Sequence, residues 1–272
     1  MYTVYLVVET PTPRTTSTPA MLVRRCHGPK RNTLMSKLSD IILIGGGGLG
    51  PWAWDRVAPK VTAMGFQVFV PQLRATGSDS TPPSSVTLSD WIEDVAAFLS
   101  DNDLRRTTLV AHSFAGYVAA GAIARNTGRI RTAVFLDALI PAVGMSWFDT
   151  MGPDAEKFMR GIARNGATPW FTHQQLDQFY PDHGLSSADL AWMESHLTDQ
   201  PLLTYTQPAI SSPWIDREVS LHYVRCLRTI PPASDIRADI PGWIFHNIDA
   251  GHWPMITAPI ETAELIVEVA RS

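Results

Sequence analysis

The chain has 272 residues but only two cysteines, Cys26 and Cys226, which lie far apart in the sequence. Neither belongs to a CxxC or Cys/His cluster, so the sequence predicts neither a disulfide framework nor a zinc site. Apolar runs are also short. None approaches the roughly 20 residues that a membrane-spanning helix needs, and the run at 5–8 is too short for the core of a signal peptide. We therefore expect a cytoplasmic protein that is not bound to a membrane.

An excess of charge of either sign is absent too. Lysine and arginine number 22 and the acids 26, which gives a net charge of -4. Nucleic acids and anionic membranes bind basic surfaces, so neither is an expected partner. Hydrophobic residues make up 45% and charged residues 18% of the chain, which is typical of a globular protein. The expected partner is a small hydrophobic molecule, and a homodimer is left open.

The N-terminal region has few apolar side chains that could be buried in a core. Residues 10–38 are rich in threonine, proline, arginine and lysine, and no acid occurs between Glu9 and Asp40. A segment of this composition does not build a core. We therefore expect residues 1–38 to be an N-terminal extension outside the fold.

From residue 41 onward, short apolar runs alternate with helical periods, which is typical of a parallel sheet covered by helices. The pattern predicts strands at 41–44, 67–70, 107–111, 133–136, 221–226 and 243–246 and helices at 54–64, 88–99, 114–125 and 260–269, with Ser89 or Asp90 capping the second helix. Helical segments rich in aromatic residues interrupt this rhythm at 141–215. The sequence thus predicts an α/β fold with a core of residues 39–140 and 216–272 and an inserted helical cap at 141–215.

One serine lies in a short turn between the strand at 107–111 and the helix at 114–125. The segment Ala-His-Ser-Phe-Ala-Gly places Ser113 there, with Ala111 two residues before it and Ala115 two residues after it. This is a variant of the G-x-S-x-G turn, in which small residues let neighbouring backbones approach. The turn directs the hydroxyl to a helix N-terminus, where free amides favour negative charge. A serine that merely caps a helix is the alternative, but strand, turn and Gly116 together favour a nucleophile.

A serine hydroxyl is a weak nucleophile and needs a general base. His252 lies in a Gly-His turn after the last predicted strand and before the last helix. This position predicts that His252 is the base, with a purely structural histidine as the alternative.

Residues 45–50 form a glycine-rich loop after the first strand. Glycine allows the backbone to approach a substrate closely. We expect the amides of Gly47 and Phe114 to form an oxyanion hole. A phosphate-binding loop is disfavoured because the spacing is not G-x-G-x-x-G and no acid follows about 20 residues later.

These motifs occur together with three shorter ones. They are the segments at 50–54 (Gly-Pro-Trp-Ala-Trp), 134–138 (Val-Phe-Leu-Asp-Ala) and 223–226 (Tyr-Val-Arg-Cys). Over about residues 40–270 the chain resembles the plant methylesterase and hydroxynitrile lyase family and related small bacterial esterases. The resemblance implies an α/β-hydrolase fold, a Ser-His-Asp triad, a helical cap, no cofactor and no metal. It also implies hydrolysis of small, often aromatic, esters.

The acid of the triad is the first departure from this family. Its acid usually lies one to four residues after the strand that here ends at Cys226, but the chain continues Leu-Arg-Thr-Ile-Pro-Pro. Asp137 ends the preceding strand of the core, and some α/β-hydrolases, fungal zearalenone lactonases among them, carry the acid there. We therefore predict Asp137 as the acid, with Asp235 as the rival. A third interpretation is that Asp137 only ties down the first turn of the cap.

The glycine-rich loop is the second departure. The lyases have a threonine in this loop and a lysine after the histidine, whereas Gly46 and Trp253 occupy these positions. The lyase interpretation is therefore disfavoured. The usual His-Gly of the loop is replaced by Gly45-Gly46, which leaves its oxyanion geometry open.

The resulting prediction is a serine hydrolase that cleaves a small hydrophobic ester or lactone through an acyl-enzyme. The alternatives are a carbamate or amide hydrolase, an enzyme like the hydroxynitrile lyases, and a non-catalytic receptor with this fold. We expect an apolar substrate pocket above the serine, and we expect His112 to pack beneath the turn. The expected pocket residues are Gly46, Leu139, Met145, Trp147, Trp170, Phe171, Trp192 and Trp253.

Overall fold

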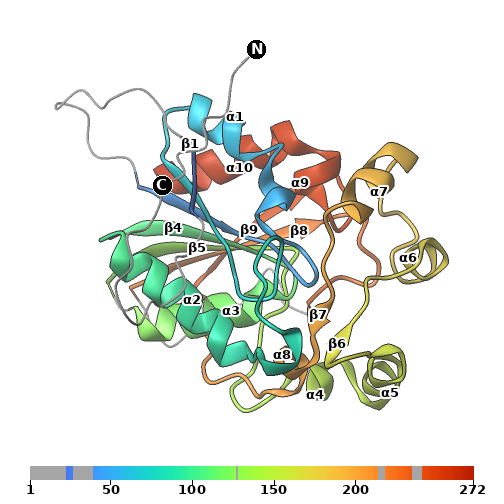
Figure 1. The fold of residues 1–272 in the computed structure, drawn as a ribbon. Coiled ribbons are helices and arrows are strands. Elements are labelled where there is room, and N and C mark those ends of the chain that lie inside the picture. Colours follow the sequence, from blue (N-terminus) through green and yellow to red (C-terminus); the bar gives the residue numbers. More distant parts are fainter. Residues whose placement is uncertain (1–22, 27–38, 127, 214–217, 235–240) are drawn as a thin grey trace, which may run out of the picture.

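A seven-stranded sheet forms the centre of the structure, a computed structural model that describes residues 23–26, 39–126, 128–213, 218–234 and 241–272 (Figure 1). The strands lie in the order β1-β3-β2-β4-β5-β8-β9, and all neighbours are parallel except β1 and β3. Their bounds are β1 Val23–Cys26, β2 Ile41–Ile44, β3 Val68–Pro71, β4 Thr107–His112, β5 Ile130–Leu136, β8 Ser220–Cys226 and β9 Trp243–Ile248. The predicted α/β fold with a mostly parallel sheet is confirmed.

Helices cover both faces of this sheet (Figure 1). One face carries α2 (Leu88–Asp101) and α3 (Ala115–Arg125), and the other carries α1 (Ala58–Ala63), α9 (Pro254–Thr257) and α10 (Pro259–Arg271). Two short 3-10 helices, η1 (Pro51–Trp54) and η2 (Pro83–Ser85), lie in the connections. None of the helices in the described ranges has the length and apolar character needed to cross a membrane.

Burial on both faces explains why the central strands are continuous apolar runs. Every residue of β2 and β4 is buried. Along β2, Ile42 and Ile44 pack into the core with α2 and α3, whereas Ile41 and Leu43 pack into the core with α1 and α10. The sheet therefore separates two hydrophobic cores.

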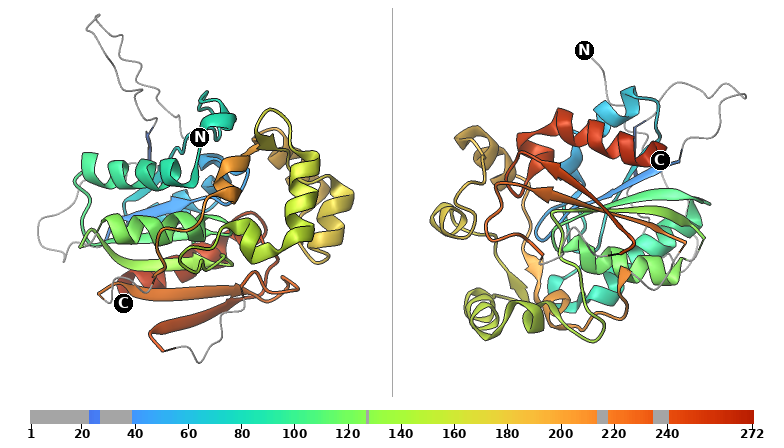
Figure 2. Two further views of the ribbon diagram at one scale, coloured as in Figure 1. Left: turned by 90° about the horizontal axis from the view of Figure 1, so that it is seen from below. Right: turned by 180° about the vertical axis from the view of Figure 1, so that it is seen from behind.

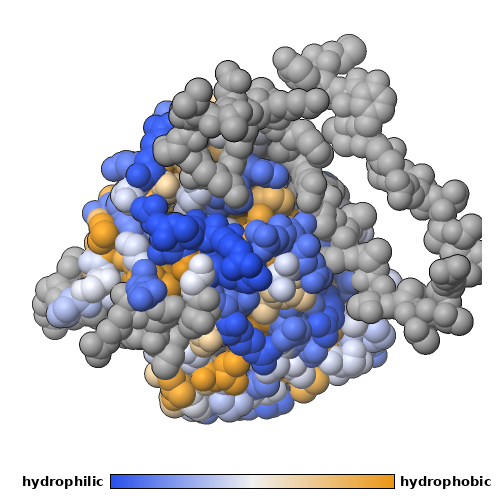
Figure 3. All heavy atoms as spheres, turned by 90° about the vertical axis from the view of Figure 1, so that its left-hand side faces the viewer, coloured by the Kyte–Doolittle hydropathy of each residue, from blue (hydrophilic) through white to orange (hydrophobic). Residues whose placement is uncertain are grey.

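The remaining elements form a cap segment, residues 141–213, beyond the carboxyl ends of the parallel strands (Figure 2). Its elements are α4 (Trp147–Met151), α5 (Pro153–Ile162), β6 (Ala167–Thr168), α6 (His173–Phe179), α7 (Ser187–Glu194), β7 (Gln200–Pro201) and α8 (Leu202–Thr206), and β6 pairs with β7. The face of the molecule away from this segment is mainly hydrophilic with scattered hydrophobic residues (Figure 3). The predicted domain boundaries stay a prediction.

The expected N-terminal extension contains a strand. Val23–Cys26 forms β1, which pairs antiparallel with β3 at one edge of the sheet. The prediction that residues 1–38 lie outside the fold is wrong for these four residues. Composition could not show this, because backbone hydrogen bonds to a strand distant in sequence do not require an apolar segment.

Two helix predictions also change in detail. The helix expected at 54–64 is divided into η1 and α1, and Pro59 lies in the first turn of α1. Proline lacks the amide that a continuous helix needs but fits a first turn. The cap of α2 is Thr87 rather than Ser89 or Asp90: the Thr87 hydroxyl accepts from the Asp90 amide and the Asp90 carboxylate accepts from the Thr87 amide. This reciprocal pair is a capping box.

Candidate active site

Ser113 lies in the turn that connects β4 to α3. Its φ angle is 54°, in the left-handed region that side chains rarely adopt. Such a strained residue persists only where its surroundings hold it, and here the neighbouring chains come very close. A Cβ atom at Gly46 would lie 2.8 Å from Ser113 Cβ, and one at Gly116 would lie 1.9 Å from the Leu139 carbonyl oxygen. The predicted tight turn is therefore built on glycines that leave no room for a side chain.

Gly116→Ala is expected to lower the melting temperature by about 5–10 °C, because the added methyl group meets backbone rather than a side chain that can move. Gly161→Ala is the matched control, since Gly161 lies in α5 with nothing within 4 Å of the added Cβ. Thermal unfolding followed by circular dichroism measures both. Equal melting temperatures for the two variants would contradict the close packing of α3 against residue 139.

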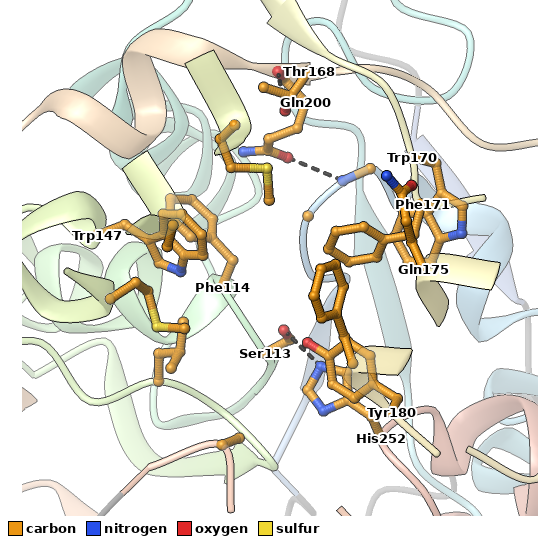
Figure 4. A pocket seen from close by; sticks show the side chains of 18 of the residues that line it. Ser113, Phe114, Trp147, Thr168, Trp170, Phe171, Gln175, Tyr180, Gln200 and His252 are labelled. Carbon is orange, nitrogen blue, oxygen red and sulfur yellow. Dashed lines mark hydrogen bonds between the residues drawn. The ribbon is translucent and has the colours of Figure 1, made fainter. Parts of the chain in front are cut away.

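A continuous hydrogen-bonded chain joins Ser113, His252 and Asp137, and Figure 4 shows the bond between Ser113 and His252. Ser113 Oγ lies 2.9 Å from His252 Nε2, and His252 Nδ1 lies 2.7 Å from Asp137 Oδ2. Since a carboxylate only accepts, Nδ1 carries the proton, and Nε2 is free to accept from the Ser113 hydroxyl. The three residues predicted from the sequence are therefore in the arrangement that activates a serine.

Asp137 is fully buried and accepts hydrogen bonds from three donors. Its Oδ1 accepts from the Cys226 amide at 3.2 Å, and its Oδ2 accepts from the Thr229 hydroxyl at 2.7 Å as well as from His252. A buried carboxylate needs such partners to remain charged. These contacts are with the end of β8 and the His252 loop, which speaks against a role limited to the first turn of the cap. Asp235 lies outside the described residues.

His252 is buried between aromatic rings. The ring of Tyr180 stacks on it with centroids 4.8 Å apart and an interplanar angle of 22°, and the His112 ring lies 4.8 Å away. Burial, and secondarily His252, lower the pKa of His112 well below its ordinary value. The neutral His112 therefore donates from Nε2 to the His252 carbonyl oxygen at 2.7 Å. This contact holds the His252 loop against the end of β4. His112 is buried and is also among the residues that line the cavity, so its packing beneath the turn stays a prediction.

The glycine-rich loop is held by the cap segment. The Gly48 amide donates to Gln200 Oε1 at 3.0 Å (Figure 4), and the Gly48 carbonyl accepts from the Thr198 amide at 3.1 Å. Gln200 Nε2 in turn donates to the Thr204 hydroxyl at 2.6 Å. Among the described residues, none accepts a hydrogen bond from the amides of Gly47 or Phe114. Gln200 thus fixes the glycine-rich loop. The amides of Gly47 and Phe114 stay available to bind an anion.

Gln200→Leu is expected to lower kcat of ester hydrolysis about tenfold to a hundredfold with a smaller change in KM, since the Gly48 amide loses its acceptor and the loop loses its position. Gln207→Leu is the matched control. Gln207 Oε1 likewise accepts from a backbone amide, that of Ser89, but the residue does not line the cavity. Steady-state kinetics at equal ester concentrations compare the two. Unchanged kcat in Gln200→Leu would show that the loop keeps its geometry without this bond.

A cavity of about 830 Å³ opens above Ser113, within the size range of small-molecule sites. Five of the expected pocket residues line it, together with the loop glycine and the turn phenylalanine. They are Leu139, Trp147, Trp170, Phe171 and Trp253, with Gly47 and Phe114. Figure 4 shows Phe114, Trp147, Trp170 and Phe171 around Ser113. In the described ranges, no group of three or more His, Cys, Asp or Glu side chains is placed to hold a metal ion.

Three expected pocket residues lie elsewhere. Gly46 packs under Ser113 rather than facing the cavity. Met145 is 39% exposed and accepts a backbone hydrogen bond from Ala209 on the outside of the cap segment. Trp192, in α7, contacts Trp52 edge to face at 5.2 Å and does not line the cavity. Met145 and Trp192 were assigned from apolar or aromatic character, which does not distinguish a cavity wall from core or surface.

Sequence reasoning missed Tyr180, Gln200 and Tyr205, which all line the cavity. Burial raises the pKa of Tyr180 to about 12 and also raises the pKa of Tyr205, so both phenols stay neutral. Tyr180 belongs to the aromatic-rich part of the cap, which was a weak signal. No local signal marks Gln200, because its partner Gly48 is distant in the sequence.

Comparison with known proteins agrees with this fold. The Alpha/beta hydrolase family model matches residues 41–265. Methylesterase 9 of Arabidopsis thaliana is 27% identical over 270 residues, covering 86% of this chain and 98% of the relative. The carbendazim hydrolyzing esterase of Nocardioides sp. (strain SG-4G) is 26% identical over 237 residues, covering 84% and 98%. An extracellular alpha/beta-hydrolase from Paenibacillus species has a TM-score of 0.73 at 20% identity, covering 86% of this chain and 100% of that one. The chain belongs to the alpha/beta hydrolase family.

Proposed function

We propose that this chain is a serine esterase that forms an acyl-enzyme on Ser113. The observation that carries the proposal is the hydrogen-bonded chain from Ser113 through His252 to Asp137 at the floor of an apolar cavity. The curated relatives named as esterases support the same reaction class. Ester and lactone are the expected bonds, since a lactone is an ester whose acid and alcohol stay joined after cleavage.

The geometry supports the following sequence of steps. His252 Nε2 takes the proton of the Ser113 hydroxyl while Oγ attacks the carbonyl carbon, and the carbonyl oxygen becomes an anion. When the carbon–oxygen bond to the alcohol breaks, His252 gives the proton to the leaving alkoxide. Water then attacks the acyl carbon with His252 as base, the acid is released and Ser113 regains its proton. Asp137 keeps the imidazole in the tautomer that these transfers need.

The oxyanion is best placed at the amides of Gly47 and Phe114. Phe114 is the N-cap of α3, so its amide lies at a helix N-terminus, where the dipole favours negative charge. A Cβ atom at Gly47 would lie 3.1 Å from the Tyr205 hydroxyl oxygen, so glycine lets the loop approach the cavity wall. Both donors lie beside the nucleophile in the cavity lining.

Other functions fit the site less well. A threonine at position 46, as in the lyases, would place its Cβ 2.8 Å from Ser113 Cβ, and Trp253 contacts Trp170 where the lyases have a lysine. A receptor would not need the bond from His252 to Ser113. Carbamate hydrolysis needs the same groups as ester hydrolysis and remains the second candidate, favoured by the relative named for carbendazim.

Covalent labelling combined with ester turnover tests the proposal. A fluorophosphonate reacts only with a serine that a base activates, so mass spectrometry should find the label on the peptide that contains Ser113. The same preparation should hydrolyse p-nitrophenyl acetate, and labelling should abolish that turnover. An unlabelled protein that binds esters without hydrolysing them would overturn the proposal in favour of a receptor.

A further inference from the structure

The cavity is larger than a methyl ester of a small acid requires. Its volume of about 830 Å³ lies toward the upper end of the range of roughly 300–1,000 Å³ found for sites of drug-sized ligands. A small ester would leave most of its apolar lining in contact with water. The residues that line the cavity therefore indicate the size and polarity of the substrate as well as the reaction type.

Two separate aromatic walls border Ser113. The α4 wall consists of Phe114, Trp147 and Tyr205, whose rings contact one another at centroid distances of 5.1 Å (Phe114 and Tyr205) and 4.4 Å (Trp147 and Tyr205). The α6 wall consists of Trp170, Phe171, Phe179, Tyr180 and Trp253.

The two walls stand on opposite sides of the nucleophile. In Figure 4, Phe114 and Trp147 lie on one side of Ser113, and Trp170, Phe171 and Tyr180 lie on the other. Among the described residues, no ring of the α4 wall contacts a ring of the α6 wall. The space above Ser113 is thus bounded by two independent apolar surfaces.

The shape of an ester carbonyl matches this arrangement. Its carbon carries three groups in one plane: the carbonyl oxygen, the acyl chain and the alcohol oxygen. If the amides of Gly47 and Phe114 hold the carbonyl oxygen while Ser113 attacks, the acyl chain and the alcohol must diverge. We propose that the substrate is a neutral ester with a bulky apolar or aromatic group on each side of the carbonyl, one against each wall. This inference rests on the proposed esterase function.

The charge of the lining supports a neutral substrate. The described residues that line the cavity include no lysine or arginine, and their single carboxylate is that of Asp154. A substrate carboxylate or phosphate would lose its hydration without gaining a cationic partner, which is costly. The groups on both sides of the ester are therefore uncharged.

Four alkyl esters with equal intrinsic reactivity test the proposal on the unmodified protein: ethyl acetate, ethyl 3-phenylpropanoate, 2-phenylethyl acetate and 2-phenylethyl 3-phenylpropanoate. Two methylene groups separate each ring from the ester, so the ring changes binding and not the leaving group. We expect each ring to raise kcat/KM about tenfold, and both together about a hundredfold. Placing a carboxylate on the acyl side instead of a ring, in 2-phenylethyl hydrogen succinate, should lower kcat/KM by at least about tenfold relative to 2-phenylethyl acetate, which lacks the acyl ring but is uncharged.

Wall variants assign each ring to a surface. Trp147→Leu in the α4 wall and Phe171→Leu in the α6 wall should each reduce the gain from one ring to less than about threefold and leave the gain from the other ring intact. Phe245→Leu is the matched control, since Phe245 is a half-buried residue of β9 outside the cavity. It should leave the gain in kcat/KM from each ring unchanged.

The outcomes separate this inference from the proposed function. Equal kcat/KM values for the four esters, or two wall variants that remove the gain from the same ring, would overturn the two-walled substrate while ester hydrolysis at Ser113 still stands. Absence of turnover on all four esters, together with absence of fluorophosphonate labelling, would overturn the proposed function itself. If each ring raises kcat/KM and each gain is lost in a different wall variant, both the two-walled substrate and the proposed esterase function are supported.

Discussion

Ser113→Ala is expected to lower kcat of ester hydrolysis by on the order of 10⁶ and to abolish fluorophosphonate labelling. The variant lacks the oxygen that would bond to the acyl group, so neither His252 nor the oxyanion amides have an acyl-enzyme to support. The fold should survive, because alanine occupies no more space than serine and the close contacts at Gly46 and Gly116 are unchanged. Steady-state kinetics and thermal unfolding measure the two effects separately.

Ser187→Ala is the control for this experiment. Ser187 is an exposed residue at the start of α7, so its variant should keep both activity and labelling. Turnover in Ser113→Ala within tenfold of the unmodified protein would mean that another group performs the attack. Loss of the cooperative unfolding transition would instead identify the substitution as a folding defect, and Ser113→Gly would then replace it.

Asp137→Asn is expected to lower kcat/KM by on the order of 10⁴. The Cys226 amide donates to Oδ1, so the asparagine places its carbonyl oxygen there and its NH₂ group toward His252. That group donates to Nδ1, which moves the imidazole proton to Nε2, where it blocks acceptance of the Ser113 proton. The reaction loses its base although every side chain remains near its place.

Asp235→Asn is the comparison that decides between the two acids considered from the sequence. It should keep kcat/KM within about threefold of the unmodified protein. The opposite result, with activity lost in Asp235→Asn and kept in Asp137→Asn, would transfer the role to Asp235. Fluorophosphonate labelling rates give a second readout, since slow labelling of folded Asp137→Asn shows a weak base rather than a weak binding site.

The local features of the site could be predicted from the sequence. Ser113 follows a buried run and precedes a helix, with small residues two positions before and after it, Ala111 and Ala115. Gly116 has no room for a side chain. His252 follows the last strand in a Gly-His turn. Each of these signals extends over fewer than about ten residues, within which sterics fix the backbone.

The acid could not be chosen in this way. Asp137 and Asp235 were both compatible with the order of motifs, and the choice depends on which strand ends meet. Pairing of β5 with β8 brings Leu136 beside Val224, and this places the Asp137 carboxylate within reach of the Cys226 amide and the Thr229 hydroxyl. The sequence shows the strands but not the hydrogen-bonding partner of a side chain beyond them.

The sequence also could not distinguish the cap residues that line the cavity from those that pack elsewhere. Trp170 and Trp192 are both tryptophans of the cap, but Trp170 borders the cavity and Trp192 packs against Trp52. Their chemical character is identical, and only the packing of α7 on the body of the protein distinguishes them. Gln200 was overlooked because no local signal marks it: the Gly48 amide that it accepts from is distant in the sequence.

The sequence by itself determined the alternating α/β order and placed Ser113 and His252 in tight turns that follow strands, because apolar periodicity and tight turns act over short stretches of chain. Only the tertiary structure decided that Asp137 faces His252, that Gln200 holds the Gly48 loop and that β1 joins the sheet. Each of these contacts joins segments distant in sequence. Their partners are selected by packing and hydrogen bonding as the chain folds, and no local pattern encodes that selection.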